Sequence, residues 1–258
     1  MSQKNFRRYV FVSSALALLL VFAGESPGED LIAQGDALWK QRDTVEGTRG
    51  AIAAWEAAAK VKNRDADLWI KIAVGYYQLG ELAAENDNKT KLEVCKKGLE
   101  AIKQALNINP ENLAAVFWKM VIQGRLTEAK GLLSGFDFGN AIRSTIFVAS
   151  RDHTFYHGGI YRFWGRVMYQ IPPVVGRFFK FRPEDSVGMY EQTMKISPYF
   201  FQTRLYLAET YIKMKDLEKA KKNLEWIVNT DPEKLPECAP ENRVYQKRAK
   251  TLLATISQ

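Results

Sequence analysis

The sequence predicts an all-α protein in which degenerate helical hairpins stack in a right-handed bundle or solenoid that ends in a capping helix. Two observations favour this fold. One set of small, bulky and proline residues recurs at constant offsets, and aromatic and aliphatic residues recur at helical spacing. The composition, with 47% hydrophobic and 26% charged residues, is that of an ordinary globular protein. A chain of 258 residues can therefore bury a core without a metal or a disulfide framework.

The N-terminus has the residue order of a secretory signal. Three basic residues open the chain: Lys4, Arg7 and Arg8. An uncharged apolar run follows over residues 9–23, and it is shorter than the roughly 20 residues of a membrane span. We assign residues 1–23 to a signal peptide cleaved before Gly24, with an uncleaved N-terminal anchor as the alternative. Residues 24–34 then form a polar, extended start of the mature chain.

The expected location is the periplasm. No cysteine follows the apolar run, so the chain offers no site for lipid attachment there. The formal net charge of +8 is too mild, once the N-terminal basic residues are set aside, to favour nucleic acid as a partner. Cys95 and Cys238 are interpreted as two isolated thiols, although a bridge between them is left open.

The first repeat-like segments open a single helical domain over residues 35–258. One half-copy consists of Ala51, Trp55 and Ala58, preceded by Gly35 and Trp39. A second copy carries these residues: Trp69, Ile72, Ala73, Tyr76, Gly98, Ile102, Ala105 and Pro110. Between Tyr76 and Gly98 the spacing is longer than in the other copies, so long helices or a solvated loop must absorb an insertion.

The repeat pattern fades over the central segment, about residues 131–183, which is rich in aromatic and basic residues. Gly158 and Gly159 break the chain, and a helix is predicted from Ile160 until shortly before Pro172. Further basic and aromatic residues lie along this segment: Arg151, Tyr161, Arg162, Phe163, Trp164, Arg166, Tyr169, Arg177, Phe178 and Phe179.

Arg162 and Arg166 stand four positions apart, on one face of this helix. One interpretation is a cationic aromatic wall that binds a carboxylate-bearing or partly apolar ligand, or an acidic partner surface. The other is that the aromatic residues fill a gap between hairpins while the arginines are solvated or cap helix ends. On the first interpretation, replacing both arginines by Gln leaves the fold nearly unchanged and weakens binding.

The sequence does not favour an enzyme or a metal site. His153 and His157 are one helical turn apart, but a dependable metal site needs further ligands and no HExxH-type arrangement occurs. No nucleophile elbow, phosphate-binding glycine loop or Cys/His nucleophile pattern is present. We therefore expect no catalytic residue, no metal and no cofactor.

The last two copies of the pattern are consecutive, and a terminal helix follows them. A partial copy contains Ser186, Tyr190, Thr193 and Pro198. The clearest copy runs from about Phe201 to Lys234, with these residues at the offsets of a tetratricopeptide repeat: Leu207, Ala208, Tyr211, Ala220, Leu224, Ile227 and Pro232. Residues 235–240 are predicted to form a loop, and residues 241–256 an amphipathic helix that caps the stack. Six aromatics are predicted to lie in the core: Trp39, Trp55, Trp69, Tyr76, Tyr190 and Tyr211.

The order of signal, degenerate repeats, central run and terminal helix resembles the TatT component of tetratricopeptide-associated TRAP transporters. The most specific element is the run Tyr156-His157-Gly158-Gly159-Ile160-Tyr161-Arg162-Phe163-Trp164-Gly165-Arg166, which leads to Ile171-Pro172. This sequence departs from the family in lacking the lipid-attachment cysteine. The resemblance implies an accessory protein that associates with the periplasmic solute-binding subunit of an importer, forms a homotrimer and holds an organic-acid or apolar ligand in a cavity.

By position in that run, seven residues are the candidates for ligand or partner binding: Gly158, Gly159, Tyr161, Arg162, Trp164, Gly165 and Arg166. The alternative function is a general cell-envelope scaffold for protein assembly, because arrays of helical hairpins present concave surfaces to many partners.

Overall fold

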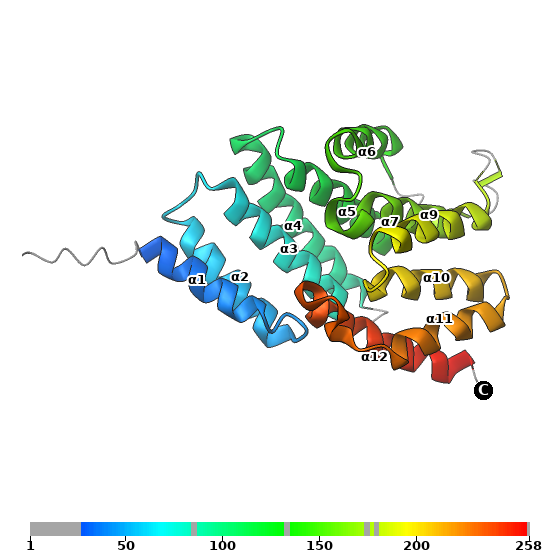
Figure 1. The fold of residues 1–258 in the computed structure, drawn as a ribbon. Coiled ribbons are helices and arrows are strands. Elements are labelled where there is room, and N and C mark those ends of the chain that lie inside the picture. The colour runs from blue at the N-terminus through cyan, green and yellow to red at the C-terminus, as the bar shows by residue number, and fades with distance from the viewer. Residues whose placement is uncertain (1–26, 84–86, 132–134, 173–175, 178–180, 257–258) are drawn as a thin grey trace, which may run out of the picture.

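The computed structural model describes residues 27–83, 87–131, 135–172, 176–177 and 181–256. The predicted signal peptide, residues 1–23, lies outside this part. The described residues are mostly helical (Figure 1), and they form these elements: α1 (Pro27–Trp39), α2 (Val45–Ala59), α3 (Ala66–Leu82), α4 (Asn88–Ile108), α5 (Leu113–Lys130), α6 (Phe138–Asp152), α7 (Phe155–Gln170), α9 (Pro183–Ile196), α10 (Phe201–Lys213), α11 (Leu217–Asn229), the short 3₁₀ helices η1 (Pro232–Lys234) and η2 (Pro236–Cys238), and α12 (Ala239–Ile256).

Polar side chains at the helix starts explain where many of these helices begin. The side chains of Thr44, Asp65, Asn112 and Asp216 each accept a hydrogen bond from a backbone N–H in the first turn of α2, α3, α5 and α11. Such a cap satisfies a donor that has no partner within the helix and typically stabilises it by about 1 kcal/mol. None of the described helices is long and apolar enough to cross a membrane.

The helices pack as consecutive hairpins: α1 with α2, α3 with α4, α5 with α6, α7 with α9, and α10 with α11. The stacked helical hairpins predicted from the sequence are therefore confirmed. The insertion in the second copy is absorbed by long helices, because α3 has 17 residues and α4 has 21. One expectation for the N-terminus is wrong: the segment predicted to be extended over residues 24–34 is helical from Pro27, where α1 begins.

The central segment does not interrupt the repeat. Helix α7 packs against α9 as the first helix of a hairpin, and Gly165 lies where the two helices cross. A Cβ atom on Gly165 would lie 2.6 Å from the ring of Tyr190, and the hydroxyl of Ser186 donates a hydrogen bond of 2.8 Å to the Gly165 carbonyl. The predicted helix from Ile160 is confirmed, since regular helical geometry in α7 begins only after Gly158.

The residues at the repeat offsets form the core. Ala208 and Ala220 have no exposed surface, as expected of small residues at the crossing of α10 and α11. Trp55 and Tyr190 are fully buried, as predicted. The other four aromatics predicted to be core are only partly buried and pack against the clusters from the side: Trp39, Trp69, Tyr76 and Tyr211.

Helix α12 does more than cap the last hairpin. It packs on α11 and α10, and it also reaches the N-terminal hairpins. The Arg42 guanidinium, just after α1, bonds to Glu241 of α12 with an Nε–Oε1 distance of 2.6 Å. Arg248 of α12 contacts the Glu81 carboxylate of α3 at 3.4 Å. Side chains of the last helix thus contact the first two hairpins.

Candidate functional site

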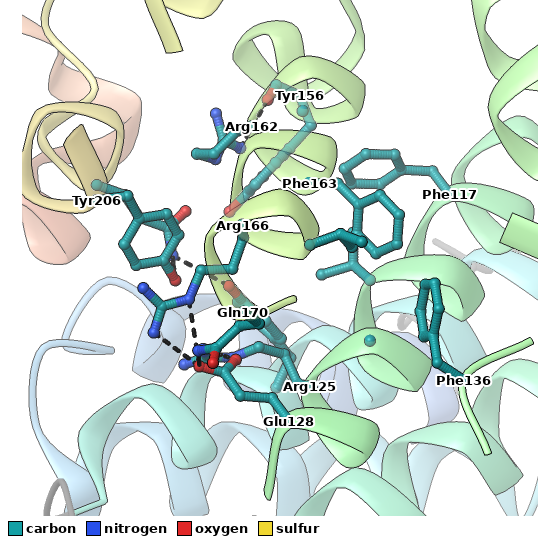
Figure 2. A pocket seen from close by; sticks show the side chains of 16 residues that line it. Phe117, Arg125, Glu128, Phe136, Tyr156, Arg162, Phe163, Arg166, Gln170 and Tyr206 are labelled. Carbon is teal, nitrogen blue, oxygen red and sulfur yellow. Dashed lines mark hydrogen bonds and ion pairs between the residues drawn. The ribbon is translucent and has the colours of Figure 1, made fainter. Parts of the chain in front are cut away.

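A cavity of about 50 Å³ lies between α3, α5, α7 and α10 (Figure 2). These four are the first helices of successive hairpins. One end of the cavity is apolar and is lined by Phe117, Val121, Phe136, Phe163 and Val167. The other end is polar and is lined by Arg125, Glu128, Arg166 and Gln170. A space of this size holds a few water molecules or one small apolar group, since a single water needs roughly 10–15 Å³ measured in the same way.

Glycines allow the aromatic rings to approach α5 and α7 at the apolar end. A Cβ atom on Gly124 of α5 would lie 2.8 Å from the Phe163 ring, and one on Gly159 of α7 would lie 2.4 Å from the Phe117 ring. The ring of Phe163 in turn lies 6.3 Å from that of Phe136, centroid to centroid. These close contacts fix the wall of the cavity and leave little room for larger residues at the two glycines.

Glu128 organises the polar end. Its Oε1 atom accepts hydrogen bonds from Arg166 Nη2 at 2.7 Å, from Arg166 Nε at 3.2 Å and from Gln170 at 2.5 Å. Its Oε2 atom accepts from Arg125 Nη1 at 2.7 Å. Two guanidinium groups from different helices therefore hold a single carboxylate. Its partners overcome the effect of burial, which would raise the pKa of Glu128, and lower it to about 2.

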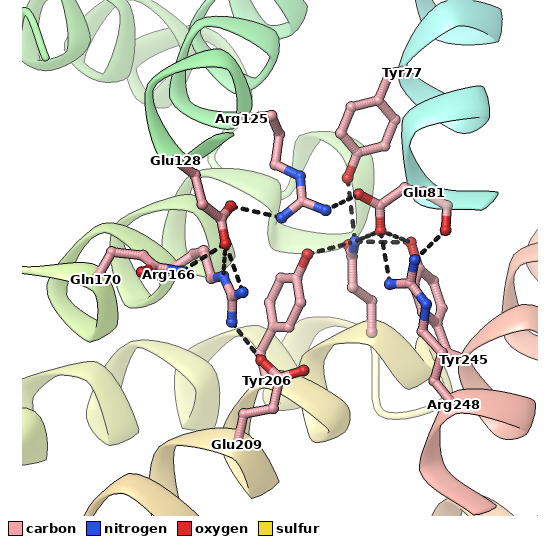
Figure 3. Close-up of polar contacts among 11 residues, drawn as sticks. Tyr77, Glu81, Arg125, Glu128, Arg166, Gln170, Tyr206, Glu209, Tyr245 and Arg248 are labelled. Carbon is pink, nitrogen blue, oxygen red and sulfur yellow. Dashed lines mark hydrogen bonds and ion pairs between the residues drawn. The ribbon is translucent and has the colours of Figure 1, made fainter. Parts of the chain in front are cut away.

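The ion pairs continue on both sides of Glu128 (Figure 3). Arg166 also pairs with Glu209 of α10, and Arg125 also pairs with Glu81 of α3. Glu81 is 1% exposed and is contacted by Arg248 as well. Burial alone would raise the pKa of Glu81, but Arg125 and Arg248 hold it below its ordinary value. The network thus balances Glu81, Glu128 and Glu209 against Arg125, Arg166 and Arg248, and it links α3, α5, α7, α10 and α12.

A cluster of tyrosine hydroxyls and one amide lies beside Glu81. The Gln202 side-chain nitrogen lies 2.8 Å from the hydroxyl of Tyr245 and 3.1 Å from those of Tyr77 and Tyr206. Burial is the main cause that raises the pKa of Tyr206 to about 12. All three phenols are therefore uncharged near neutral pH and act as hydrogen-bonding groups in this cluster.

Of the seven predicted site residues, Gly159, Arg162 and Arg166 line the cavity. Arg162 is only 5% exposed, so the alternative interpretation, in which the arginines are solvated, does not hold for it. Its guanidinium donates hydrogen bonds of 3.1 Å to the carbonyls of Tyr156 and His157 and lies 4.5 Å from the Phe200 ring centroid. Both carbonyls belong to residues with positive φ, 47° and 58°. Arg162 therefore holds a strained turn in place.

The other four predicted residues have packing roles. Gly158 has a φ of 69°, a conformation that glycine adopts without strain, and Gly165 allows α7 to approach α9. The Trp164 indole donates a hydrogen bond of 2.8 Å to the Thr145 hydroxyl of α6. Tyr161 packs, partly buried, against the larger core cluster. The structure thus brings three of the seven residues to the cavity wall, and the other four pack between helices.

Sequence reasoning missed Arg125, Glu128 and Glu81, which belong to none of the motifs singled out in the sequence. A signal was present in α5. Phe117, Val121, Arg125 and Glu128 follow one another at helical spacing and share one face, which places charged residues in line with apolar ones. Their partners on α3, α7 and α10 are far away in the sequence, so the ion pairs themselves could not be read from it.

The histidine pair does not form a metal site in the described residues, in which no group of three or more potential ligands occurs. His153 is exposed, whereas His157 is partly buried between Ser197 and Cys238. The Cys238 sulfur lies 3.1 Å from His157 Nε2. Burial raises the pKa of Cys238 to about 12, which keeps the thiol protonated. Cys95 and Cys238 are both buried, free thiols.

Residues 31–257 match the model of a family described as regulator of microtubule dynamics protein 1-3. No curated protein sequence matches the chain. Among solved structures, the fold resembles TTC0263, a thermophilic TPR protein of Thermus thermophilus, with a TM-score of 0.53 and 16% identity over 87% of this chain and 99% of that one. At this identity the likeness concerns the fold alone.

Two further structures share less of the geometry. A MamA RS-1 double mutant has a TM-score of 0.45 and 9% identity, and the match covers 78% of this chain and 92% of that one. The human IFIT1 dimer with m7Gppp-AAAA has a TM-score of 0.45 and 16% identity, over 88% of this chain and 59% of that one.

Proposed function

Since this chain belongs to the family of regulator of microtubule dynamics proteins 1-3, we propose that it is a non-catalytic scaffold that binds a partner protein and takes an apolar group into its central cavity. The helical-hairpin fold supports protein–protein interaction as its general role. A binding role fits the cavity better than catalysis, because its charged residues are engaged with one another. Outside the cavity, the Cys238 thiol beside His157 is held protonated and is therefore a poor nucleophile.

One observation carries the proposal. The cavity is lined by the first helices of consecutive hairpins, and in arrays of this kind the first helices face the inner, concave surface. Here the inner surface contains a small space that is apolar at one end. The geometry suits a side chain or a small ligand better than an extended peptide.

The finer proposal is that the chain is exported and that its partner is the solute-binding subunit of a TRAP-type importer. The charged and apolar order of residues 1–23 and the resemblance of the Tyr156–Arg166 run to TatT support it. Neither the family match nor the fold bears on this partner. A start near Gly24 in the mass of the protein from the envelope fraction would support export, and full-length protein in the cytoplasm would contradict it.

The description of the family favours a second candidate partner, a protein that acts in microtubule dynamics. Co-sedimentation of the purified chain with polymerised microtubules tests it directly. A basic chain can also sediment with an acidic polymer through charge alone, so the amount bound must saturate with microtubule concentration and persist as the salt concentration is raised. A general envelope scaffold stays the alternative when neither partner binds.

The cavity itself is tested with a variant that fills it. Val121 of α5 lines the cavity and is partly buried, so Val121→Phe places a ring in the empty space. We expect the variant to fold and to lose binding of the solute-binding subunit, measured by calorimetry with the purified proteins. Exposed Ile142 on α6, at 47% exposure, provides the matched control Ile142→Phe, which should bind as the wild type does. Equal loss in both variants, or in neither, would show that the partner does not use the cavity.

A further inference from the structure

The polar end of the cavity is built like a site for a carboxylate, and it already contains one. Arg125 and Arg166 approach from α5 and α7, and the amide of Gln170 points to the same oxygen atom as Arg166 (Figure 2). Guanidinium groups bind carboxylates through such paired N–H donors. The group held there is the side chain of Glu128, with N–O distances of 2.7 Å to each arginine.

The neighbouring acids leave no net positive charge at this end. Arg166 donates a hydrogen bond through Nη1 to Glu209, and Arg125 donates one through Nη2 to Glu81. Each guanidinium is therefore shared by two carboxylates. A ligand carboxylate that entered the cavity would meet Glu128 and would have to displace it, and displacement would leave a buried acid without its partners.

The rest of the cavity favours an uncharged group. Glu128 is 21% exposed, so it forms part of the wall and is not hidden behind it. The opposite walls are the rings of Phe117, Phe136 and Phe163, which offer apolar area and no charge. Arg162, the remaining cation in the lining, donates its hydrogen bonds to the carbonyls of Tyr156 and His157. An anion in the cavity would have to compete with these bonds for its counter-ion, which makes its transfer from water unfavourable.

We propose that Glu128 is a specificity-determining residue: it acts as a built-in carboxylate that occupies the Arg125–Arg166 pair, excludes acidic ligands and leaves the cavity to small uncharged apolar groups. This inference rests on the proposed binding function and narrows it, because the organic acid expected from the resemblance to TatT is excluded as the group that enters the cavity. The chemistry is the same whether the group is a free molecule or a side chain of the partner.

The test compares two small probes of similar size, ethanol and acetate, on the full chain by calorimetry. The wild type should bind ethanol about tenfold more tightly than acetate, or more. In Glu128→Ala the two arginines become available, so acetate should gain about tenfold or more and the preference should reverse. Glu100→Ala on α4 removes an exposed carboxylate outside the cavity and is the matched control, for which no change is expected.

Circular dichroism shows whether each variant folds, and Glu128→Gln serves in place of Glu128→Ala if the latter does not, since it keeps the side-chain shape and removes the charge. Ethanol binding to the wild type without a gain of acetate binding in the variant would overturn the role of Glu128 and leave the proposed function intact. Acetate binding only in the variant would support the role of Glu128 and contradict the apolar ligand. If neither chain binds either probe, both proposals are wrong.

Competition separates the two sources of the apolar group. If ethanol displaces the purified solute-binding subunit from the wild type, the group is a side chain of the partner. If both bind at once, it is a free molecule, and the partner uses another surface.

Discussion

Gly165 shows how one residue that looks functional can be required by packing. It belongs to the run that carried the functional resemblance, yet a Cβ atom there would lie 2.6 Å from the Tyr190 ring. Gly165→Ala should therefore lower the free energy of unfolding by about 1–3 kcal/mol through overpacking. Gly188→Ala is the matched control in α9, because nothing lies within 4 Å of its Cβ position and alanine favours a helix. Urea unfolding of both variants gives the comparison, and an equal midpoint would mean that the helix crossing is placed wrongly.

Arg162 gives a second prediction at this scale. Its guanidinium satisfies two carbonyls of the turn at Tyr156 and His157 and is buried at 5% exposure. Arg162→Gln should cost about 2–3 kcal/mol, because hydrogen bonds from a charged donor are lost and buried carbonyls are left without a partner. Arg49→Gln on the exposed face of α2 should change stability by less than about 0.5 kcal/mol. Thermal unfolding followed by circular dichroism measures both changes in stability. A loss of stability as small as that of the control would mean that Arg162 does not hold the turn.

At the scale of helices, the sequence predicted the hairpins correctly where the repeat pattern has no insertion. Helices α10 and α11 and their crossing alanines follow directly from the small and bulky residues between Phe201 and Lys234. The hairpin of α7 and α9 was missed because a long connection separates Gly165 from Ser186. The longer spacing between Tyr76 and Gly98 had been recognised as an insertion within one repeat. The same allowance after Gly165 would have paired α7 with α9.

The docking of α12 against α3 gives the prediction at this scale. Glu81 is 1% exposed and bonds to Arg125 and Arg248, so Glu81→Gln removes the charge that both guanidiniums face. Loss of one partner from such a buried cluster typically costs about 3–5 kcal/mol. Glu93→Gln breaks only the exposed i,i+4 pair with Lys97 and should cost about 0.5 kcal/mol or less.

Urea unfolding measures both losses. Hydrogen exchange should also show faster exchange of α12 amides in Glu81→Gln than in Glu93→Gln. Unchanged protection of α12 would mean that its packing on α10 and α11 alone holds it in place.

At the scale of the whole molecule, long-range ion pairs join the two ends of the stack of hairpins. Pairs such as Arg42 with Glu241 join residues at opposite ends of the chain. Helical periodicity predicts which face of a helix is apolar, but it does not tell which helices meet across the inner surface. The sequence therefore predicted a row of hairpins with a capping helix, and the family resemblance implied a cavity, but neither could place the cavity between α3, α5, α7 and α10 or predict the network beside it.

The same network predicts how stability depends on pH. The pKa of Glu128 is about 2 in the folded protein, against an ordinary value of 4.5. Between these two values the unfolded chain binds a proton that the folded chain does not, so stability falls as the pH is lowered through this range and is independent of this group above it. The difference between the two pKa values corresponds to roughly 3 kcal/mol at most.

Glu128→Gln removes this titration, and the partly exposed aspartates whose pKa is also lowered, such as Asp87 and Asp216, are the same in both chains. We therefore expect the unfolding free energy of the wild type, followed by urea titration at a series of pH values, to fall more steeply between pH 4.5 and 2 than that of the variant. The two curves should run parallel between about pH 6 and 8, because a carboxylate with an ordinary pKa of about 4 is ionised there in the unfolded chain as well as in the folded one. Parallel curves in acid as well would show that Glu128 is not held by Arg125 and Arg166 in solution, and the specificity proposed for it would lose its structural basis.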